Sequence, residues 1–275
     1  MKMDSLSKLA LKISSLTLAI AATSACTAMA TGADSQVSNP QTTTNSTAIT
    51  LGNSAMSSGT NDTVAIGNKA NAGLNSATAV GGQANAAGLG STSIGWQSKA
   101  TAERAQAFGH LANASGVRST AVGEAAMAGG TNDTVAVGNK ANAGLNSATA
   151  VGGEANAAGL GSTSIGWKSK ATSERAQAFG HLADASGVRA TAVGEAAAAQ
   201  GANSVAVGNK SMAAGMNSIA IGNEAKAAKN NQVVLGNAGQ VQSSTVAQSG
   251  TVRIVTIDDN GTLGTMMVDY YQKAK

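Results

Sequence analysis

The chain has almost no aromatic residues, one proline and one cysteine. Phe, Trp and Tyr together make up 2% of its 275 residues, so few large side chains are present to stabilise a globular core at about 1.5–3 kcal/mol each. A single cysteine, Cys26, excludes an intrachain disulfide. The formal net charge of +4 is spread along the chain, which argues against a nucleic-acid partner.

Glycine, in contrast, is abundant and periodic. Thirteen glycines, here termed the coil glycines, follow one another at steps of 14 residues, with one step of 15 between Gly123 and Gly138. A degenerate earlier copy lies at Gly52. A short fixed period with a constant residue type at each phase predicts a solenoid of stacked coils. The coil glycines are Gly67, Gly81, Gly95, Gly109, Gly123, Gly138, Gly152, Gly166, Gly180, Gly194, Gly208, Gly222 and Gly236.

A larger repeat lies on top of the coil period. Residues 59–127, the first copy, recur almost unchanged as residues 130–198, the second copy. This pattern indicates a tandem duplication. The recurrence of a residue in both copies is therefore not independent evidence for its function.

Each coil has the same order of residue types. The residue before each coil glycine is large and apolar, as in Ile66 and Phe108, and these residues form the apolar column. Two residues earlier comes a mostly β-branched position, as in Thr78, which forms the threonine column. Such residues favour a short strand. Small residues three and five positions after the glycine, as in Ala70 and Ala72, share one face of a second strand. We therefore predict strand, glycine turn, strand and turn in every coil.

An α-helix does not fit these columns. A glycine about every seven residues would cost about 1 kcal/mol each in a helix, and the apolar positions do not follow the helical period. Stacked strands lie roughly 4.8 Å apart, so thirteen coils predict a rod on the order of 60 Å long. We expect its interior to contain alanine methyl groups plus one Val or Ile per coil. So thin a core predicts a homo-oligomer that buries an outward apolar column at a symmetric interface.

The two ends of the chain differ from the coils. Residues 1–30 are typical of a signal peptide, with Lys2, Lys8 and Lys12 before an apolar stretch and with cleavage expected after Ala30. A lipoprotein signal that ends at Cys26 is the alternative. We predict secretion or display on a bacterial surface, a flexible lead-in over residues 31–48 and the repeat domain over residues 49–237. Residues 238–275 are expected to form a small β cap, because residues 251–257 alternate like a strand and Asp259 to Gly261 is a hairpin turn signal.

Six residues are the least generic candidates for the surface. Trp96, His110 and Glu124 occupy the same phase of successive coils, so they are expected to stack as a ladder. The two tryptophans either bind a ligand or pack against neighbouring residues. A metal site needs at least three ligands, and His110 with Glu124 offers two, so we expect no metal and no cofactor. The candidate surface-binding residues are Trp96, Arg104, His110, Trp167, Arg175 and His181.

The sequence also bears on two other classes of function, ice binding and catalysis. The threonine column includes Thr78, Thr92 and Thr120, and regular threonine ladders on flat solenoids bind ice. Gln106 and Gln177 interrupt this ladder. The sequence contains one hexapeptide of the acyltransferase β-helix type per coil, but that fold needs three per coil, and no Ser/His/Asp constellation is visible. We therefore expect no enzyme. A purely structural surface protein remains an alternative.

The columns resemble the head of YadA-type trimeric autotransporter adhesins, whose coils follow a pattern close to S-x-A-[IV]-G-x-x-A-x-A. Here the pattern appears as STAVGEAAMA at residues 119–128 and SIAIGNEAKA at residues 218–227. Residues 231–237, NQVVLGN, are similar to the final coil of such heads. The resemblance covers about residues 45–237. It implies a left-handed parallel β-roll, a homotrimer and multivalent adhesion to an extracellular matrix or cell-surface ligand, with an indirect link to the membrane and a role in virulence. Nothing after Gly236 shows the heptads of the stalk or the length of the membrane anchor that usually follow such heads.

Overall fold

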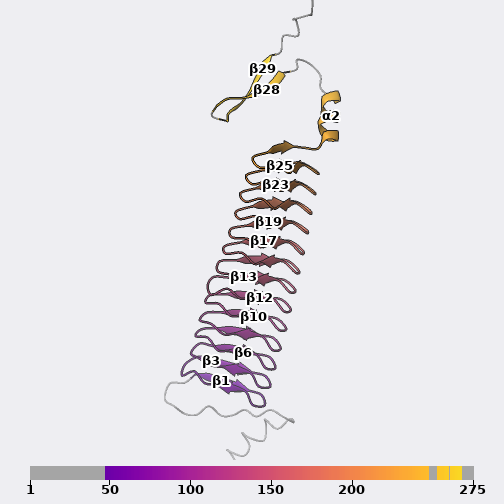
Figure 1. The fold of residues 1–275 in the computed structure, drawn as a ribbon. Helices are drawn as coiled ribbons and strands as arrows, with labels where there is room; N and C mark the ends of the chain where they lie inside the picture. The colour runs from indigo at the N-terminus through magenta and orange to yellow at the C-terminus, as the bar shows by residue number, and fades with distance from the viewer. Residues whose placement is uncertain (1–46, 248–252, 260, 268–275) are drawn as a thin grey trace, which may run out of the picture.

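The computed structural model describes residues 47–247, 253–259 and 261–267. The predicted signal peptide and residues 31–46 of the lead-in lie outside the described residues. Most of the described chain forms one long roll of stacked coils (Figure 1). The all-β parallel solenoid expected from the repeats is therefore confirmed.

Each coil contributes one strand to each of two parallel sheets, which lie back to back. The long-strand sheet has 14 strands and the short-strand sheet has 13. The long-strand sheet consists of β1 (Ala48–Leu51), β3 (Thr63–Ile66), β5 (Thr78–Val80), β7 (Thr92–Ile94), β9 (Gln106–Phe108), β11 (Thr120–Val122), β13 (Val135–Val137), β15 (Thr149–Val151), β17 (Thr163–Ile165), β19 (Gln177–Phe179), β21 (Thr191–Val193), β23 (Val205–Val207), β25 (Ile219–Ile221) and β27 (Val233–Leu235).

The short-strand sheet follows the same order along the roll. It consists of β2 (Met56–Ser57), β4 (Asn71–Ala72), β6 (Asn85–Ala86), β8 (Lys99–Ala100), β10 (Asn113–Ala114), β12 (Met127–Ala128), β14 (Asn142–Ala143), β16 (Asn156–Ala157), β18 (Lys170–Ala171), β20 (Asp184–Ala185), β22 (Ala198–Ala199), β24 (Met212–Ala213) and β26 (Lys226–Ala227).

The register keeps equivalent residues of successive coils side by side. Ile66 of β3 is paired with Val80 of β5, one repeat later. Across the step of 15 residues, Val122 is still paired with Val137. The extra residue therefore lies in the turn between β12 and β13, and every column continues past it.

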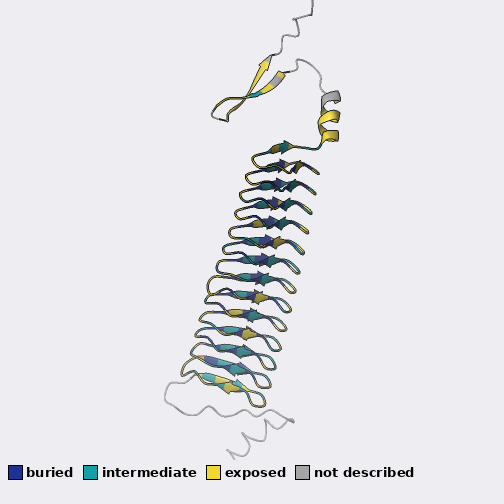
Figure 2. Ribbon diagram, in the orientation of Figure 1, coloured by how far each residue is buried: buried dark blue, intermediate teal, exposed yellow. Residues whose placement is uncertain are grey.

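The interior between the sheets is narrower than the sequence suggested. Ala65 from the long-strand sheet, Ala72 from the short-strand sheet and Ala70 directly before β4 are fully buried, and this pattern continues along the roll (Figure 2). The largest fully buried side chains among the described residues are threonine and serine. The expectation of one Val or Ile per coil in the core was wrong. Ile66 follows the buried Ala65, so strand alternation places its side chain on the outer face.

The coil glycines allow the coils to stack this closely. Gly67 has a φ of 131°, a conformation that L-residues with a side chain rarely adopt. A Cβ on Gly67 would lie 2.5 Å from the carbonyl oxygen of Gly81 in the next coil. Both the backbone conformation and the approach of the neighbouring coil therefore require glycine at this phase.

The C-terminal region contains one expected and one unexpected element. β28 (Arg253–Ile257) and β29 (Leu263–Met267) form the expected antiparallel hairpin. That this hairpin covers the end of the roll stays a prediction. Helix α2 (Ala238–Ala247) was not expected. Asn237 and Gln240 begin it as a capping box, because each side-chain oxygen accepts a hydrogen bond of 3.0 Å from the backbone N–H of the other residue.

Candidate functional site

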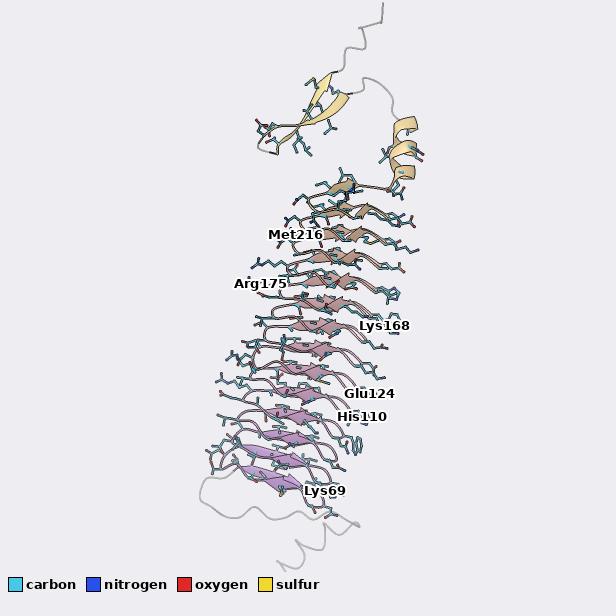
Figure 3. The ribbon with its side chains drawn as sticks, in the orientation of Figure 1. Lys69, His110, Glu124, Lys168, Arg175 and Met216 are labelled. Carbon is cyan, nitrogen blue, oxygen red and sulfur yellow. The ribbon has the colours of Figure 1, made fainter. Side chains whose placement is uncertain are left out.

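The candidate residues lie on two different edges of the flattened coil. Trp96 and His110 belong to the turns that directly follow a coil glycine, whereas Arg104 belongs to a turn that follows a short strand. Figure 3 shows His110, Glu124 and Lys168 along one edge of the roll and Arg175 along the other. The six candidates therefore do not form a single cluster.

The predicted ladder in the first copy is confirmed. The rings of Trp96 and His110 are stacked, with centroids 5.0 Å apart and an interplanar angle of 21°. Nδ1 of His110 lies 3.6 Å from Oε1 of Glu124. Asn139 of the following coil donates a hydrogen bond of 3.1 Å from Nδ2 to Oε2 of Glu124. Contacts across four successive coils thus hold the Trp96 ring in place.

The second copy repeats this arrangement. The rings of Trp167 and His181 lie 5.0 Å apart at an interplanar angle of 15°. Nδ1 of His181 lies 3.5 Å from Oε1 of Glu195, which accepts a hydrogen bond of 3.2 Å from Asn209 through Oε2. These two four-residue series are termed the first and second aromatic ladders.

The tryptophans are held and exposed at the same time. Trp96 is 47% exposed and Trp167 is 46% exposed. On the side away from each histidine, the coil before the tryptophan has a glycine at the equivalent position. A Cβ on Gly82 would lie 3.1 Å from Cδ1 of Trp96, and Gly153 has the same relation to Trp167. The absence of a side chain at these glycines leaves room for each indole.

The arginine edge is more exposed and less ordered by contacts. Arg104 lies 3.8 Å from the adjacent Glu103 and its side chain is 70% exposed. Arg175 and Glu174 are related in the same way, at 3.8 Å. Such exposed pairs contribute little to stability.

A stronger ion pair on this edge was not expected. Arg118 donates two hydrogen bonds to the carboxylate of Asp133, of 2.7 and 2.8 Å. The hydrogen bond from Arg118 lowers the pKa of Asp133, and the same contact raises the pKa of Arg118. Asp133 lies in the turn that contains the extra residue, so this pair ties the first copy to the second.

Differences between the two copies reveal further residues that sequence reasoning missed. In the second copy, Nζ of Lys168 lies 4.1 Å from the centroid of a Trp167 ring and 3.7 Å from Oε2 of Glu154. Glutamines replace both residues in the first copy, where Gln97 donates a hydrogen bond of 3.1 Å from Nε2 to Oε1 of Gln83. Aligning the copies would have shown these substitutions, but the contacts depend on side-chain conformation.

A shallow groove of about 210 Å³ lies beside the first aromatic ladder. Its walls are contributed by β8, β10 and β12 of the short-strand sheet and by the turns before them. The lining residues are Gln97, Lys99, Leu111, Asn113, Ala125, Ala126 and Met127.

The two outer faces of the roll have different chemistry. The short-strand sheet carries mostly polar side chains, with Met56, Met127 and Met212 as large apolar exceptions. Asn71 donates a hydrogen bond of 2.9 Å to Asn85 in the next coil. The long-strand sheet carries the apolar column, in which Ile94 is 38% exposed and Ile221 is 43% exposed. One face is therefore suited to water and the other to a partner surface.

The described residues lack two features, a cluster of metal ligands and a membrane-spanning helix. No group of three or more His, Cys, Asp or Glu side chains is placed to hold a metal ion there. In the same part of the chain, no helix is long and apolar enough to span a membrane.

Comparison with known proteins places the repeats in a family. The family model described as the YadA head domain repeat (2 copies) matches residues 75–98, 86–112, 100–126, 114–141, 146–169, 157–183, 185–211 and 213–237. A search of curated proteins gives no match. Among solved structures, the collagen-binding domain of the Yersinia adhesin YadA is similar, with 21% identity over 78% of this chain and 85% of that chain and a TM-score of 0.23. Because the repeat matches cover more than half of the chain, it belongs to the family of YadA head domain repeat proteins.

Proposed function

We propose that the roll is the homotrimeric head of an adhesin that acts outside the cell or on the bacterial surface. Family membership supports the general role. The observation that carries the proposal is the apolar outer face of the long-strand sheet. A single chain leaves that face open to water along the whole roll.

The apolar column needs a partner surface. Its residues stand one coil apart, in register, from Ile66 to Leu235, and Leu235 is 63% exposed. The stripe is on the order of 60 Å long, and a continuous exposed apolar surface of this kind marks an interaction site in soluble proteins. The interior offers little compensation, because it is built from alanine and serine. Packing three rolls around an axis, with the long-strand sheets inward, covers the stripe by closed symmetry.

Such an assembly presents its polar faces outward in three identical copies. Each contact between one coil and a ligand is small and weak. Three parallel copies on a rigid rod convert the later contacts into intramolecular events, which raises the avidity without any new kind of contact. The proposed ligand is therefore a repetitive extracellular matrix or cell-surface polymer.

Solid-phase binding of the full chain tests the adhesin role. Immobilised collagen, fibronectin, laminin and glycans serve as probes, and collagen is included because the similar solved domain is described as collagen-binding. We expect the trimer to bind at least one of these surfaces, and a dissociated variant to bind it at least about tenfold more weakly because avidity is lost. Absence of binding to every probe and to intact cells would contradict the adhesin role and favour a purely structural protein.

The structure gives no observation that favours ice binding. Thr78 and Thr92 are neighbours in the threonine column, but the next position is Gln106. The threonine column shares the outer face of the long-strand sheet with the apolar column, so the proposed trimer would cover both. Thermal hysteresis in a solution of the purified chain would favour ice binding over adhesion.

A further inference from the structure

The two copies of the duplicated segment have diverged mainly in one place. They differ at seven positions, and four of these lie beside the aromatic ladders, in the turns after the coil glycines and on the short-strand sheet. The substitutions from the first to the second copy are Gln83 to Glu154, Gln97 to Lys168, Asn113 to Asp184 and Met127 to Ala198 near the ladders, and Ile66 to Val137, Ala102 to Ser173 and Ser119 to Ala190 elsewhere.

In the second copy, both faces of the tryptophan ring have a partner. His181 of the following coil stacks on one face at 5.0 Å. The ammonium group of Lys168 lies 4.1 Å from the ring centroid and contacts Glu154, which belongs to the preceding coil. The ammonium therefore lies on the face opposite His181, where the ring attracts a cation.

In the first copy, the corresponding face of Trp96 has no cation. His110 covers one face, and Gly82 has no side chain to cover the other. Gln97 and Gln83 form a neutral pair of amides beside the ring, joined by a hydrogen bond of 3.1 Å. The exposed fractions of Trp96 and Trp167 are nearly equal, at 47% and 46%. The copies thus differ in the chemistry next to the indole and not in how much of it is exposed.

The groove of about 210 Å³ lies next to Gln97, and Lys99 is its one charged lining residue. Gln97 lines it together with Leu111, Asn113 and Met127. It is smaller than the pockets of about 300–1,000 Å³ that enclose drug-sized ligands, so its size suits one ring of a larger molecule. Three of its lining residues are among the substituted positions, and two of the substitutions introduce charge while the third removes the Met127 side chain.

We propose that Trp96 and the amides of Gln83 and Gln97 form a subsite for a neutral pyranose ring of a surface glycan, and that the groove beside Gln97 accommodates the next ring of the glycan. A pyranose ring has an apolar C–H face that packs on an indole, and hydroxyl groups that donate and accept hydrogen bonds, as carboxamides also do. In the second copy a sugar would have to displace Lys168 from the ring and from Glu154. The subsite therefore exists once per chain, in the first copy. This proposal rests on the proposed adhesin function and names the ligand class of one of its contacts.

Titration of the full chain with lactose, cellobiose and chitobiose tests the subsite, and 3′-sialyllactose is the anionic comparison. Isothermal titration calorimetry measures the affinity without a fluorescent reporter, so Trp96→Ala and Trp167→Ala can be compared directly. We expect at least one neutral disaccharide to bind. Trp96→Ala should weaken it by about tenfold or more, as expected for a tryptophan that the ligand covers, while the matched control Trp167→Ala changes it by less than about twofold.

A reciprocal exchange tests the same idea without removing an indole. Gln83→Glu with Gln97→Lys should abolish disaccharide binding in the first copy. Glu154→Gln with Lys168→Gln should raise the stoichiometry from one to two per chain. Circular dichroism and mass in solution, unchanged in each variant, show that the roll is intact.

Several results would overturn the subsite while leaving the adhesin role in place. One is an equal loss of disaccharide affinity in the two tryptophan variants, and another is no change in binding after the reciprocal exchange. Tighter binding of sialyllactose than of lactose would also overturn the subsite, as would a Trp96 whose fluorescence acrylamide cannot quench in the assembled protein. Binding of the chain to protein or cell surfaces but to none of the neutral disaccharides would have the same meaning. A chain that adheres to no surface at all would instead contradict the proposed function.

Discussion

The two outer faces of the roll are built on the same alanine interior but carry opposite chemistry. The long-strand sheet presents the apolar column, of which Val122 is a member. The short-strand sheet of the same coils presents Asn113 and Lys99. Both faces repeat in register from coil to coil, so each forms a continuous stripe.

This difference separates assembly from recognition. A roll with so small an interior obtains little stability from burial within one chain, because each alanine contributes only a methyl group. The apolar stripe offers the missing burial once several chains pack together. The polar face is then left to vary, and the two copies of the duplicated segment have diverged more on that side than in the apolar column.

A charge placed on the apolar stripe should have the largest effect on assembly and stability, because it removes the difference in chemistry between the two faces. Val122→Asp puts a carboxylate on the face that the proposed trimer would bury, and an unpaired ion in such a place costs several kcal/mol. Symmetry multiplies this cost by three. We expect loss of the trimer and a lower melting temperature, measured by sedimentation velocity and circular dichroism.

The matched control carries the same charge on the other face. Asn113→Asp reproduces in the first copy the residue that the second copy already has at Asp184. Mass and melting temperature should remain those of the unmodified chain. Equal damage from the two substitutions would show that the apolar stripe is not an interface.

The glycine turn that joins the two faces gives the next largest effect. Gly109 has a φ of 131°, and a Cβ there would lie 2.6 Å from the carbonyl oxygen of Gly123. Gly109→Ala should cost about 1–3 kcal/mol from backbone strain, with a further cost from the contact with the next coil. Chemical denaturation measures this loss.

Gly129 provides the control for that substitution. A Cβ on Gly129 would meet its nearest neighbour at 3.9 Å, so alanine fits there. Gly129→Ala should leave the free energy of unfolding almost unchanged. A tolerant Gly109→Ala variant would mean that the coils separate more easily than the structure indicates.

A smaller effect is expected from a polar contact that crosses the interior. The hydroxyl groups of Ser93, in β7, and Ser98, directly before β8, lie 2.7 Å apart and are buried. Ser93→Ala should lower the free energy of unfolding by about 0.5–1.5 kcal/mol. The value belongs at the lower end, because Ser98 also donates to the carbonyl oxygen of Gly95 at 3.0 Å.

The copies supply a reference for this measurement as well. The second copy has Ala190 where the first has Ser119, so Ser119→Ala is a substitution that the roll already contains. If the free energy of unfolding, measured by denaturant titration, were higher for Ser93→Ala than for Ser119→Ala, the hydroxyl pair would not hold the sheets together.

The smallest predicted effect is the pH-dependent contribution of the Arg118–Asp133 ion pair to stability. Arg118 lowers the pKa of Asp133 in the folded chain, so the pair stabilises the roll above the unfolded-state pKa of about 3.9. That contribution is lost as the pH falls through the lower folded-state pKa. Asp133→Asn should therefore reduce the melting temperature slightly near pH 7, and the two curves should converge at about pH 2. The same difference in melting temperature at pH 7 and pH 2 would mean that the substitution acts through side-chain packing and not through the lost ion pair.

The stacking of side chains between coils was predictable from the sequence because parallel, in-register coils place equal phases side by side. That rule alone placed Trp96 next to His110 and His110 next to Glu124, and it placed the alanines at Ala70 and Ala72 on one buried face. It requires no knowledge of side-chain conformation, since the backbone register determines the neighbours.

Other features depended on details that periodicity does not contain. The width of the interior follows from the alternation of Ala65, which points inward, and Ile66, which points outward. The sequence analysis wrongly predicted one Val or Ile per coil in the interior. Helix α2 has a short and polar sequence, and its only sequence signal is the capping box of Asn237 and Gln240. The position of Lys168 over Trp167 follows from its side-chain conformation and its contact with Glu154.

Sedimentation equilibrium of the unmodified chain at several concentrations tests most directly whether the apolar stripe is an interface. A mass of three chains, which persists on dilution until folding itself is lost, is the predicted result. A single chain that remains folded and melts at high temperature would contradict the account, because an alanine interior would then suffice without partners.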